Sequence, residues 1–145
     1  MNWENPPWTL TISSDSRMLS VTRSFVEAVC RIADLEKPLI HAIVLSAGEA
    51  FTNIVRHAHR DRPQAQIQLQ CRLNPDSVEI RIHDEGAPFD LDSVPHMNPK
   101  EMRVGGRGVY LMRTLMDELS CVPRPEGGNT LRMVKYRKPG MRDCG

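Results

Sequence analysis

The fold class is decided by residues 65–84, which read AQIQLQCRLNPDSVEIRIHD. Residues 65–73 alternate strictly between apolar and polar side chains, and residues 78–84 alternate again after the turn Asn74-Pro75-Asp76. Alternation with a period of two is typical of a strand that buries one face, and Asn-Pro-Asp favours a turn. The stretch therefore predicts an antiparallel β-hairpin, whose expected inward positions are Ile67, Leu69, Cys71, Leu73, Val78, Ile80 and Ile82.

One strand and two helices are predicted upstream of this hairpin. Residues 8–13, WTLTIS, alternate as a short strand does, and Ser14 or Asp15 then caps a first helix that runs to about residue 34. Pro38 suits the first turn of a second helix, which runs to about His59, because an N–H group there has no partner inside the helix. The expected core positions are Met18, Val21, Phe25, Val29 and Ile32 in the first helix, and Ile40, Ile43, Val44, Ala47, Phe51, Ile54 and Ala58 in the second.

A long aperiodic segment follows the hairpin. Residues 85–106 contain three prolines and three glycines, and a loop of this length tends to be a functional lid or a disordered segment. A third helix is expected from about Gly108, with apolar positions Leu111, Met112, Leu115, Met116 and Leu119. Two short strands are expected near 119–122 and 130–136. The mixture of helices with antiparallel hairpins predicts an α+β two-layer sandwich.

Composition limits the classes of function. The chain has 145 residues, which predicts one domain over 1–145 with a core at about 9–138. Its 19 Lys and Arg against 18 Asp and Glu give a net charge of +1, which argues against direct binding of nucleic acid or a membrane surface. No stretch approaches the roughly 20 apolar residues of a membrane span, and the first ten residues do not read as a signal peptide. We therefore expect a cytoplasmic protein.

The cysteines and histidines give no sign of a metal site or of disulfides. The four cysteines stand singly in the sequence, which predicts reduced thiols. His57 and His59 are two residues apart, and no further ligands are spaced to complete a zinc site. Metal binding through histidine and cysteine is therefore not expected.

A polar stripe is expected on the second helix, where Glu49, Asn53 and His57 follow at four-residue intervals. Steps of four drift only about 40° around a helix, so the three side chains share one face. Taken alone, such a stripe is more often a solvated face than a functional one.

Two further motifs stand next to segments that have no regular secondary-structure pattern. Asp84-Glu85-Gly86 ends the predicted hairpin, where a carboxylate can accept from an exocyclic amine and a glycine lets a flat ligand approach the backbone. Gly105-Gly106-Arg107-Gly108 opens the third helix, where free N–H groups attract anions. Each has an ordinary alternative, a simple turn in the first case and a flexible joint in the second.

Together and in this order, the motifs resemble the N, G1 and G2 boxes of the GHKL (Bergerat-fold) ATPase superfamily. The matching segments are EAFTNIVRHAH at 49–59, DEGAPFDLD at 84–92, GGRGVYLMRTLMDEL at 105–119 and GGNTLRM at 127–133. The resemblance runs from about Thr9 to Lys138 and is closest to the anti-sigma factor serine/threonine-protein kinases of the RsbW and SpoIIAB type. It implies a histidine-kinase-like ATPase fold, with a mixed, mainly antiparallel sheet and helices on one face. One departure is Pro88, which stands where the superfamily usually has a second glycine.

The resemblance also implies roles on the second helix and around the base. Glu49 matches the general base, Asn53 matches the residue that holds Mg²⁺ against the nucleotide phosphates, and His57 stands near the phosphates. Asp84 matches the carboxylate that accepts from the adenine amine. Gly86 and Ala87 join it at the base, and Thr130 supports the contact.

For the phosphates, the resemblance implies binding by Gly105, Gly106 and Gly108. An arginine of the lid is expected to neutralise the γ-phosphate, with Arg103 as first choice and Arg107 as second. The implied cofactors are ATP and Mg²⁺.

The function implied is that of an anti-sigma factor with ATP-dependent protein serine kinase activity. It would sequester a sigma factor, phosphorylate a serine of a STAS-domain anti-anti-sigma partner, and form a homodimer. The alternative is an ATP-binding interaction module without phosphotransfer, which would not need the carboxylate of Glu49. A histidine kinase catalytic domain is disfavoured, because no phospho-accepting helical hairpin precedes the first strand.

Overall fold

The computed structural model describes residues 7–96 and 107–137. In chain order its elements are β1 (Trp8–Ser13), the 3-10 turn η1 (Ser16–Met18), α1 (Leu19–Ile32), α2 (Lys37–Asn53), the π-helical turn η2 (Ile54–Ala58), β2 (Gln66–Leu73), β3 (Ser77–His83), the 3-10 turn η3 (Leu91–Ser93), α3 (Arg107–Leu115), β4 (Glu118–Pro123) and β5 (Asn129–Tyr136). This order of strands and helices is the one predicted.

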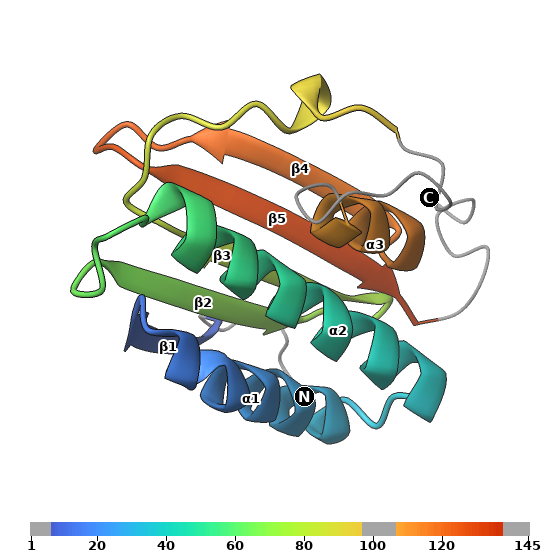
Figure 1. Cartoon of the computed structure of the whole chain (residues 1–145). Coiled ribbons are helices and arrows are strands. Elements are labelled where there is room, and N and C mark those ends of the chain that lie inside the picture. The colour runs from blue at the N-terminus through green and yellow to red at the C-terminus, as the bar shows by residue number, and fades with distance from the viewer. Residues whose placement is uncertain (1–6, 97–106, 138–145) are drawn as a thin grey trace.

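The sheet has the strand order β1-β2-β3-β5-β4, and every pairing among the described strands is antiparallel. The central hairpin forms as predicted, and in its register Leu69 lies opposite Ile82 and Cys71 lies opposite Ile80. All three helices cover one face of the sheet (Figure 1). The predicted α+β two-layer sandwich is confirmed.

The core lies between the helices and the covered face of the sheet. Ile67, Leu69, Ile80 and Ile82 are completely buried, as the alternation predicted. From the helix layer, α2 contributes the large side chain of Phe51. The remaining buried apolar positions of α2 include Ile43, Ala47 and Ala50. The continuous helical stretch Lys37–Ala58 has the length and composition to cross a membrane, but here it is the central helix packed on the sheet.

The predicted core face of α1 was wrong at two of its five positions. Val21 and Ile32 are 38% and 56% exposed, whereas Thr22 and Cys30 are completely buried. The buried face runs through Thr22, Val26, Val29 and Cys30, at steps of three and four residues, so it is turned from the predicted apolar set.

Two helix ends also differ from the prediction. The second helix is α-helical only to Asn53 and then widens into the π-helical turn, in which the His59 N–H donates to the Ile54 carbonyl at 2.8 Å. The third helix ends at Leu115, and Leu119, expected both on this helix and in a strand near 119–122, lies in β4. π-Helical turns occur frequently at functional sites, and this one borders the cavity described next.

Candidate functional site

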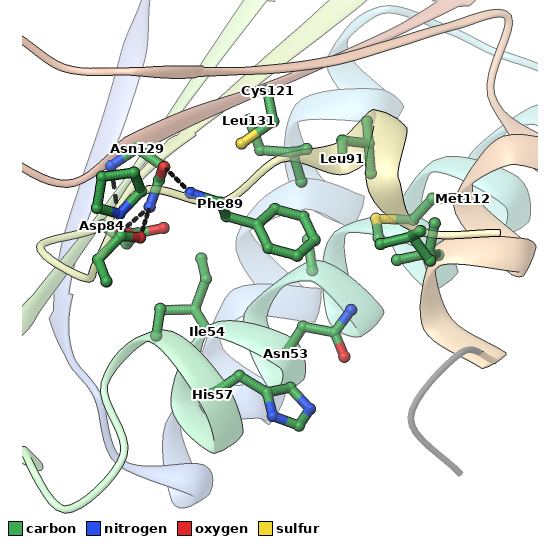
Figure 2. A pocket seen from close by; sticks show the side chains of 16 residues that line it. Asn53, Ile54, His57, Asp84, Phe89, Leu91, Met112, Cys121, Asn129 and Leu131 are labelled. Atoms are coloured by element: carbon green, nitrogen blue, oxygen red, sulfur yellow. Dashed lines mark hydrogen bonds between the residues drawn. The ribbon is translucent and has the colours of Figure 1, made fainter. Parts of the chain in front are cut away.

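A cavity of about 310 Å³ opens beside the end of α2. Its polar lining comes from Asn53, His57, Asp84 and Asn129 (Figure 2). Its apolar lining comes from side chains of α2, η2, α3, β4, β5 and the segment after Asp84: Ala50, Ile54, Ala58, Ala87, Pro88, Phe89, Leu91, Val94, Val109, Met112, Cys121 and Leu131. Ligand pockets of this kind are mostly apolar with a few placed polar groups.

The Asp84 carboxylate lies at one end of this cavity and is only 6% exposed. Its Oδ1 atom accepts three hydrogen bonds: from the Gly86 N–H at 2.8 Å, from the Asn129 N–H at 3.2 Å and from the Asn129 side-chain amide at 3.1 Å. Among the described residues, none donates to Oδ2. One carboxylate oxygen is thus fixed by the protein, and the other keeps its capacity to accept from a ligand.

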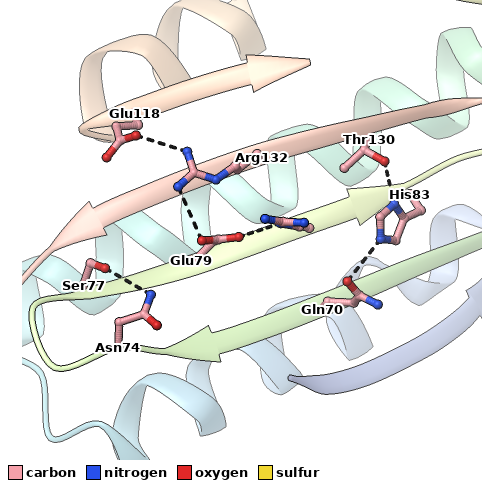
Figure 3. A network of polar contacts seen from close by, with 9 residues as sticks. Gln70, Asn74, Ser77, Glu79, His83, Glu118, Thr130 and Arg132 are labelled. Carbon is pink, nitrogen blue, oxygen red and sulfur yellow. Dashed lines mark hydrogen bonds and ion pairs between the residues drawn. The ribbon is translucent and has the colours of Figure 1, made fainter. Parts of the chain in front are cut away.

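Asn129, which the sequence reasoning missed, is the side chain of β5 that contacts Asp84. Thr130 instead lies on the sheet face away from the helices, where its hydroxyl is 2.7 Å from Nδ1 of His83 (Figure 3). The signal was present in the alternation of β5, because Asn129 shares the inward face of Leu131 and Met133. The structure therefore does not bring Thr130 to the carboxylate.

Two glycines allow the chain to pack closely around Asp84. A Cβ atom on Gly86 would lie 2.6 Å from Cβ of Ala58, so this glycine permits the Asp84 segment to rest on the π-helical turn. Gly128 has φ +89°, and a Cβ atom there would lie 1.8 Å from the Asp84 carbonyl oxygen. Both positions require glycine for steric reasons.

The polar stripe of α2 meets the start of α3. A Cβ atom on Gly108 would lie 2.9 Å from Nδ2 of Asn53 and 3.2 Å from Oε2 of Glu49. The structure thus brings Glu49, Asn53 and Gly108 together, although Glu49 is not among the residues that line the cavity. Asn53 is half-buried, and His57 is exposed at the cavity rim.

The remaining predicted site residues lie partly inside and partly outside the described residues. Ala87 lines the cavity, and Arg107 is exposed at the first residue of α3. Arg103, Gly105 and Gly106 lie outside the described residues.

His59 is a second residue that the sequence reasoning did not assign to the site. It is 2% exposed, and its Nε2 atom accepts a hydrogen bond from the Glu85 N–H at 2.8 Å. Burial lowers the pKa of His59, and Arg62 lowers it further, against the opposing effects of Asp84 and Glu85. A neutral His59 therefore supports the chain directly after Asp84.

Two arginine side chains donate hydrogen bonds to backbone carbonyls of segments on two sides of the cavity. Arg124 donates to the Asp84 carbonyl at 3.2 Å and pairs with Glu126 at 2.6 Å. Arg113 of α3 donates to the carbonyls of Leu91 at 2.9 Å, Val94 at 2.9 Å and Pro95 at 3.4 Å. The first part of the predicted lid is thereby attached to α3.

The donor types fit a nucleotide with Mg²⁺ and do not fit a histidine–cysteine metal site. Among residues 7–96 and 107–137, no three His, Cys, Asp or Glu side chains gather to hold a metal ion. Burial raises the pKa of the Cys121 thiol in the cavity wall to about 11, so this thiol stays protonated at neutral pH. Asn53 offers an amide oxygen at the cavity wall, and Mg²⁺ binds through one or two protein oxygens together with substrate phosphates.

Comparison with known proteins places these features in a family. Residues 12–135 match the histidine kinase-like ATPase domain. The serine-protein kinase RsbW of Listeria innocua is 28% identical over 136 residues, which cover 88% of this chain and 85% of that protein. The serine-protein kinase RsbW of Bacillus subtilis is 31% identical over 105 residues, which cover 67% of this chain and 64% of that protein.

A solved structure shares the fold. The RsbU and RsbW domains of Rv1364c from Mycobacterium tuberculosis superpose with a TM-score of 0.67 at 17% identity, over 93% of this chain and 34% of that one. The match to the family model covers most of the chain, and three of the polar residues that the family resemblance singled out, Asn53, His57 and Asp84, line one cavity. The chain therefore belongs to the histidine kinase-like ATPase family, and it is similar in sequence to the RsbW serine-protein kinases.

Proposed function

We propose that this protein is an ATP-dependent protein serine kinase that acts as an anti-sigma factor. The observation that carries the proposal is that two separate groups of polar side chains line the cavity. Asp84 has an uncommitted carboxylate oxygen, and Asn53 and His57 line another part of the wall, on α2 and η2. Such a cavity suits a ligand with an amine-bearing flat base and a phosphate chain.

The base of ATP is proposed to bind at the Asp84 end. Oδ2 of Asp84 accepts a hydrogen bond from the exocyclic amine of adenine. Gly86 and Ala87, which follow Asp84 in the chain, lie beside the base. The apolar side chains of Leu131 and Val109 line the same cavity and exclude water from the base.

The phosphates are proposed to bind at the α2–α3 end. The amide oxygen of Asn53 would hold Mg²⁺, which neutralises phosphate charge during the transfer. His57 lies at the rim for a phosphate contact, with Gly105, Gly106 and Gly108 as backbone donors and Arg103 or Arg107 at the γ-phosphate.

Glu49 is proposed as the general base. It lies one helical turn before Asn53, beside the start of α3, where a substrate hydroxyl entering next to the γ-phosphate would meet it. A carboxylate that removes the hydroxyl proton typically contributes 10²–10⁴-fold to the rate.

The partners proposed are a sigma factor and a STAS-domain anti-anti-sigma protein, in the cytoplasm, with the kinase as a homodimer. Similarity to the RsbW serine-protein kinases supports this. Phosphorylation adds nearly two negative charges to the partner's serine, which would release that partner by repulsion and desolvation cost.

The experiment is phosphotransfer from radiolabelled ATP to STAS-domain proteins, with wild-type protein and Glu49→Gln in parallel. The proposal expects label on a serine of one STAS protein and a loss of at least about 100-fold in Glu49→Gln, with ATP affinity unchanged. ATP binding without any transfer would instead support an interaction module, and equal transfer by Glu49→Gln would remove the base assignment.

A further inference from the structure

The side chain of Asn129 links the three parts of the chain that form the Asp84 end of the cavity. Its amide nitrogen donates to Oδ1 of Asp84 at 3.1 Å and to the Ala87 carbonyl at 2.8 Å, and its amide oxygen accepts from the Phe89 N–H at 2.9 Å. The residue is 1% exposed, so these bonds form in a dry environment where losing one is costly. Figure 2 shows the amide between the Asp84 carboxylate and the chain that carries the Phe89 ring.

We infer that Asn129 is the positioning residue that makes Asp84 selective for a purine with an exocyclic amine. This inference rests on the proposed nucleotide-binding function and assigns the residue that sets its base selectivity.

The two oxygens of the Asp84 carboxylate are in different environments. Asn129 gives Oδ1 two of its three donors, one from the backbone and one from the side chain. With Oδ1 saturated, the carboxylate cannot rotate to exchange its oxygens without breaking buried hydrogen bonds. Oδ2 is therefore held as the acceptor, and an acceptor fixed in place discriminates against a base that has no donor to offer.

The Asn129 amide also fixes the Asp84 carboxylate relative to the part of the cavity wall that contains Ala87 and Phe89. By bonding to both Ala87 and Phe89, it fixes the residues that follow the Asp84 turn, and these residues line the cavity. No other described side chain bridges Asp84 to this segment. Thr130, which the family resemblance implied for this role, bonds to His83 on the other face of the sheet.

The test compares two ligands on each variant: ATP and purine riboside 5′-triphosphate, which lacks the exocyclic amine. Calorimetry on wild-type protein with Mg²⁺ is expected to give about 10- to 100-fold tighter binding of ATP, which corresponds to one hydrogen bond to a charged acceptor. In Asn129→Ala the ratio is expected to fall to within about threefold of unity, mostly through weaker ATP binding. Asn74→Ala, which removes an asparagine amide bonded to Ser77 at the far hairpin turn, is the matched control and should keep the wild-type ratio.

The ratio is measured within one variant, so a general loss of stability lowers both affinities and leaves it unchanged. If Asn129→Ala does not fold, Asn129→Ser is used, because one hydroxyl cannot span Asp84, Ala87 and Phe89, and the same fall is expected. A wild-type ratio in the Asn129 variant, or a collapse in Thr130→Val instead, would overturn the inference. Equal binding of both ligands by wild type would also overturn it, whereas failure of wild type to bind either one would refute the proposed function itself.

Discussion

Gly108, the second residue of α3, faces Asn53 of α2 so closely that a Cβ atom on it would lie 2.9 Å from the Asn53 amide nitrogen. The same atom would lie 3.2 Å from Oε2 of Glu49. The two helices thus approach each other at the side chains proposed for metal binding and proton removal. A single methyl group added at Gly108 would displace both.

Gly108→Ala is therefore expected to separate activity from stability. Alanine favours a helix over glycine by about 0.5–1 kcal/mol, and the atoms it meets are the ends of side chains that can turn away. We expect an unfolding temperature equal to or above that of wild type, with phosphotransfer lowered roughly 10- to 100-fold through misplaced groups. Thr114→Ala, an exposed position on the same helix, is the control and should leave phosphotransfer unchanged. Wild-type transfer by Gly108→Ala would contradict the proposed roles of Glu49 and Asn53.

Gly127 and Gly128 provide a matched pair at the turn before β5. Both have positive φ angles, +103° and +89°, but a Cβ atom on Gly127 has nothing within 4 Å whereas one on Gly128 would lie 1.8 Å from the Asp84 carbonyl oxygen. Gly127→Ala should cost about 1–2 kcal/mol of backbone strain. Gly128→Ala should cost at least about 1–3 kcal/mol more, because the backbone of Asp84 must move. Urea unfolding of the two variants checks the difference, and equal losses would mean that Gly128 does not pack against Asp84.

Stability is expected to fall as the pH drops below about 6.5, the ordinary pKa of histidine. Burial lowers the pKa of His59 and also that of His83, for which Arg124 and Arg81 lower it further. Below pH 6.5 the unfolded chain therefore binds more protons than the folded one, and the stability present above that pH is progressively lost. Urea unfolding of wild type from pH 5 to pH 8 should give a free energy of unfolding that rises with pH.

The contribution of His59 can be isolated with His59→Gln. Glutamine retains an acceptor for the Glu85 N–H and does not titrate, so the pH dependence should become shallower in this variant. His83→Gln should remove a separate part of the slope, since His83 bonds to Thr130 and Gln70 on the other face of the sheet. A slope unchanged in His59→Gln would show that burial does not lower the pKa of His59.

Arg113→Met tests the attachment of the segment after Asp84. Methionine keeps an apolar stem but cannot donate to the carbonyls of Leu91, Val94 and Pro95. We expect a loss of about 1–3 kcal/mol in stability and faster release of a fluorescent ATP analogue in stopped-flow measurements, because Leu91 and Val94 line the cavity. Arg31→Met removes an exposed pair with Glu27 and is the control. Unchanged release from Arg113→Met would show that this attachment does not retain nucleotide.

Much of the fold follows from the sequence where pattern and turn chemistry agree. The hairpin of β2 and β3 was predicted with its inward face, which includes Leu69 and Ile82, because strict alternation marks the side chains that are buried. The buried face of α1 was not, since it includes the polar Thr22 and leaves the apolar Val21 and Ile32 exposed. Packing of this kind depends on neighbours that are distant in the sequence.

The site was predictable in part for a similar reason. Asp84 stands at a motif, but Asn129, which donates to its carboxylate, and His59, which accepts from the next backbone N–H, are 45 and 25 residues away from it in the sequence. The choice between Asn129 and Thr130 depends on which residue of β5 faces inward, and the pairing of Thr130 with His83 settles this. The π-helical turn beneath Gly86 also has no signature in the residues that form it.

The central claim is that the cavity binds ATP through the Asp84 carboxylate, and calorimetric titration with ATP and Mg²⁺ tests it most directly. Wild type and Asp84→Asn are compared, since the amide keeps the shape of the side chain but removes the charge that attracts the amine donor. The account predicts saturable binding by wild type and an affinity at least about tenfold lower in Asp84→Asn, with both proteins folded. Equal affinity of the two proteins, or no binding by wild type, would contradict it.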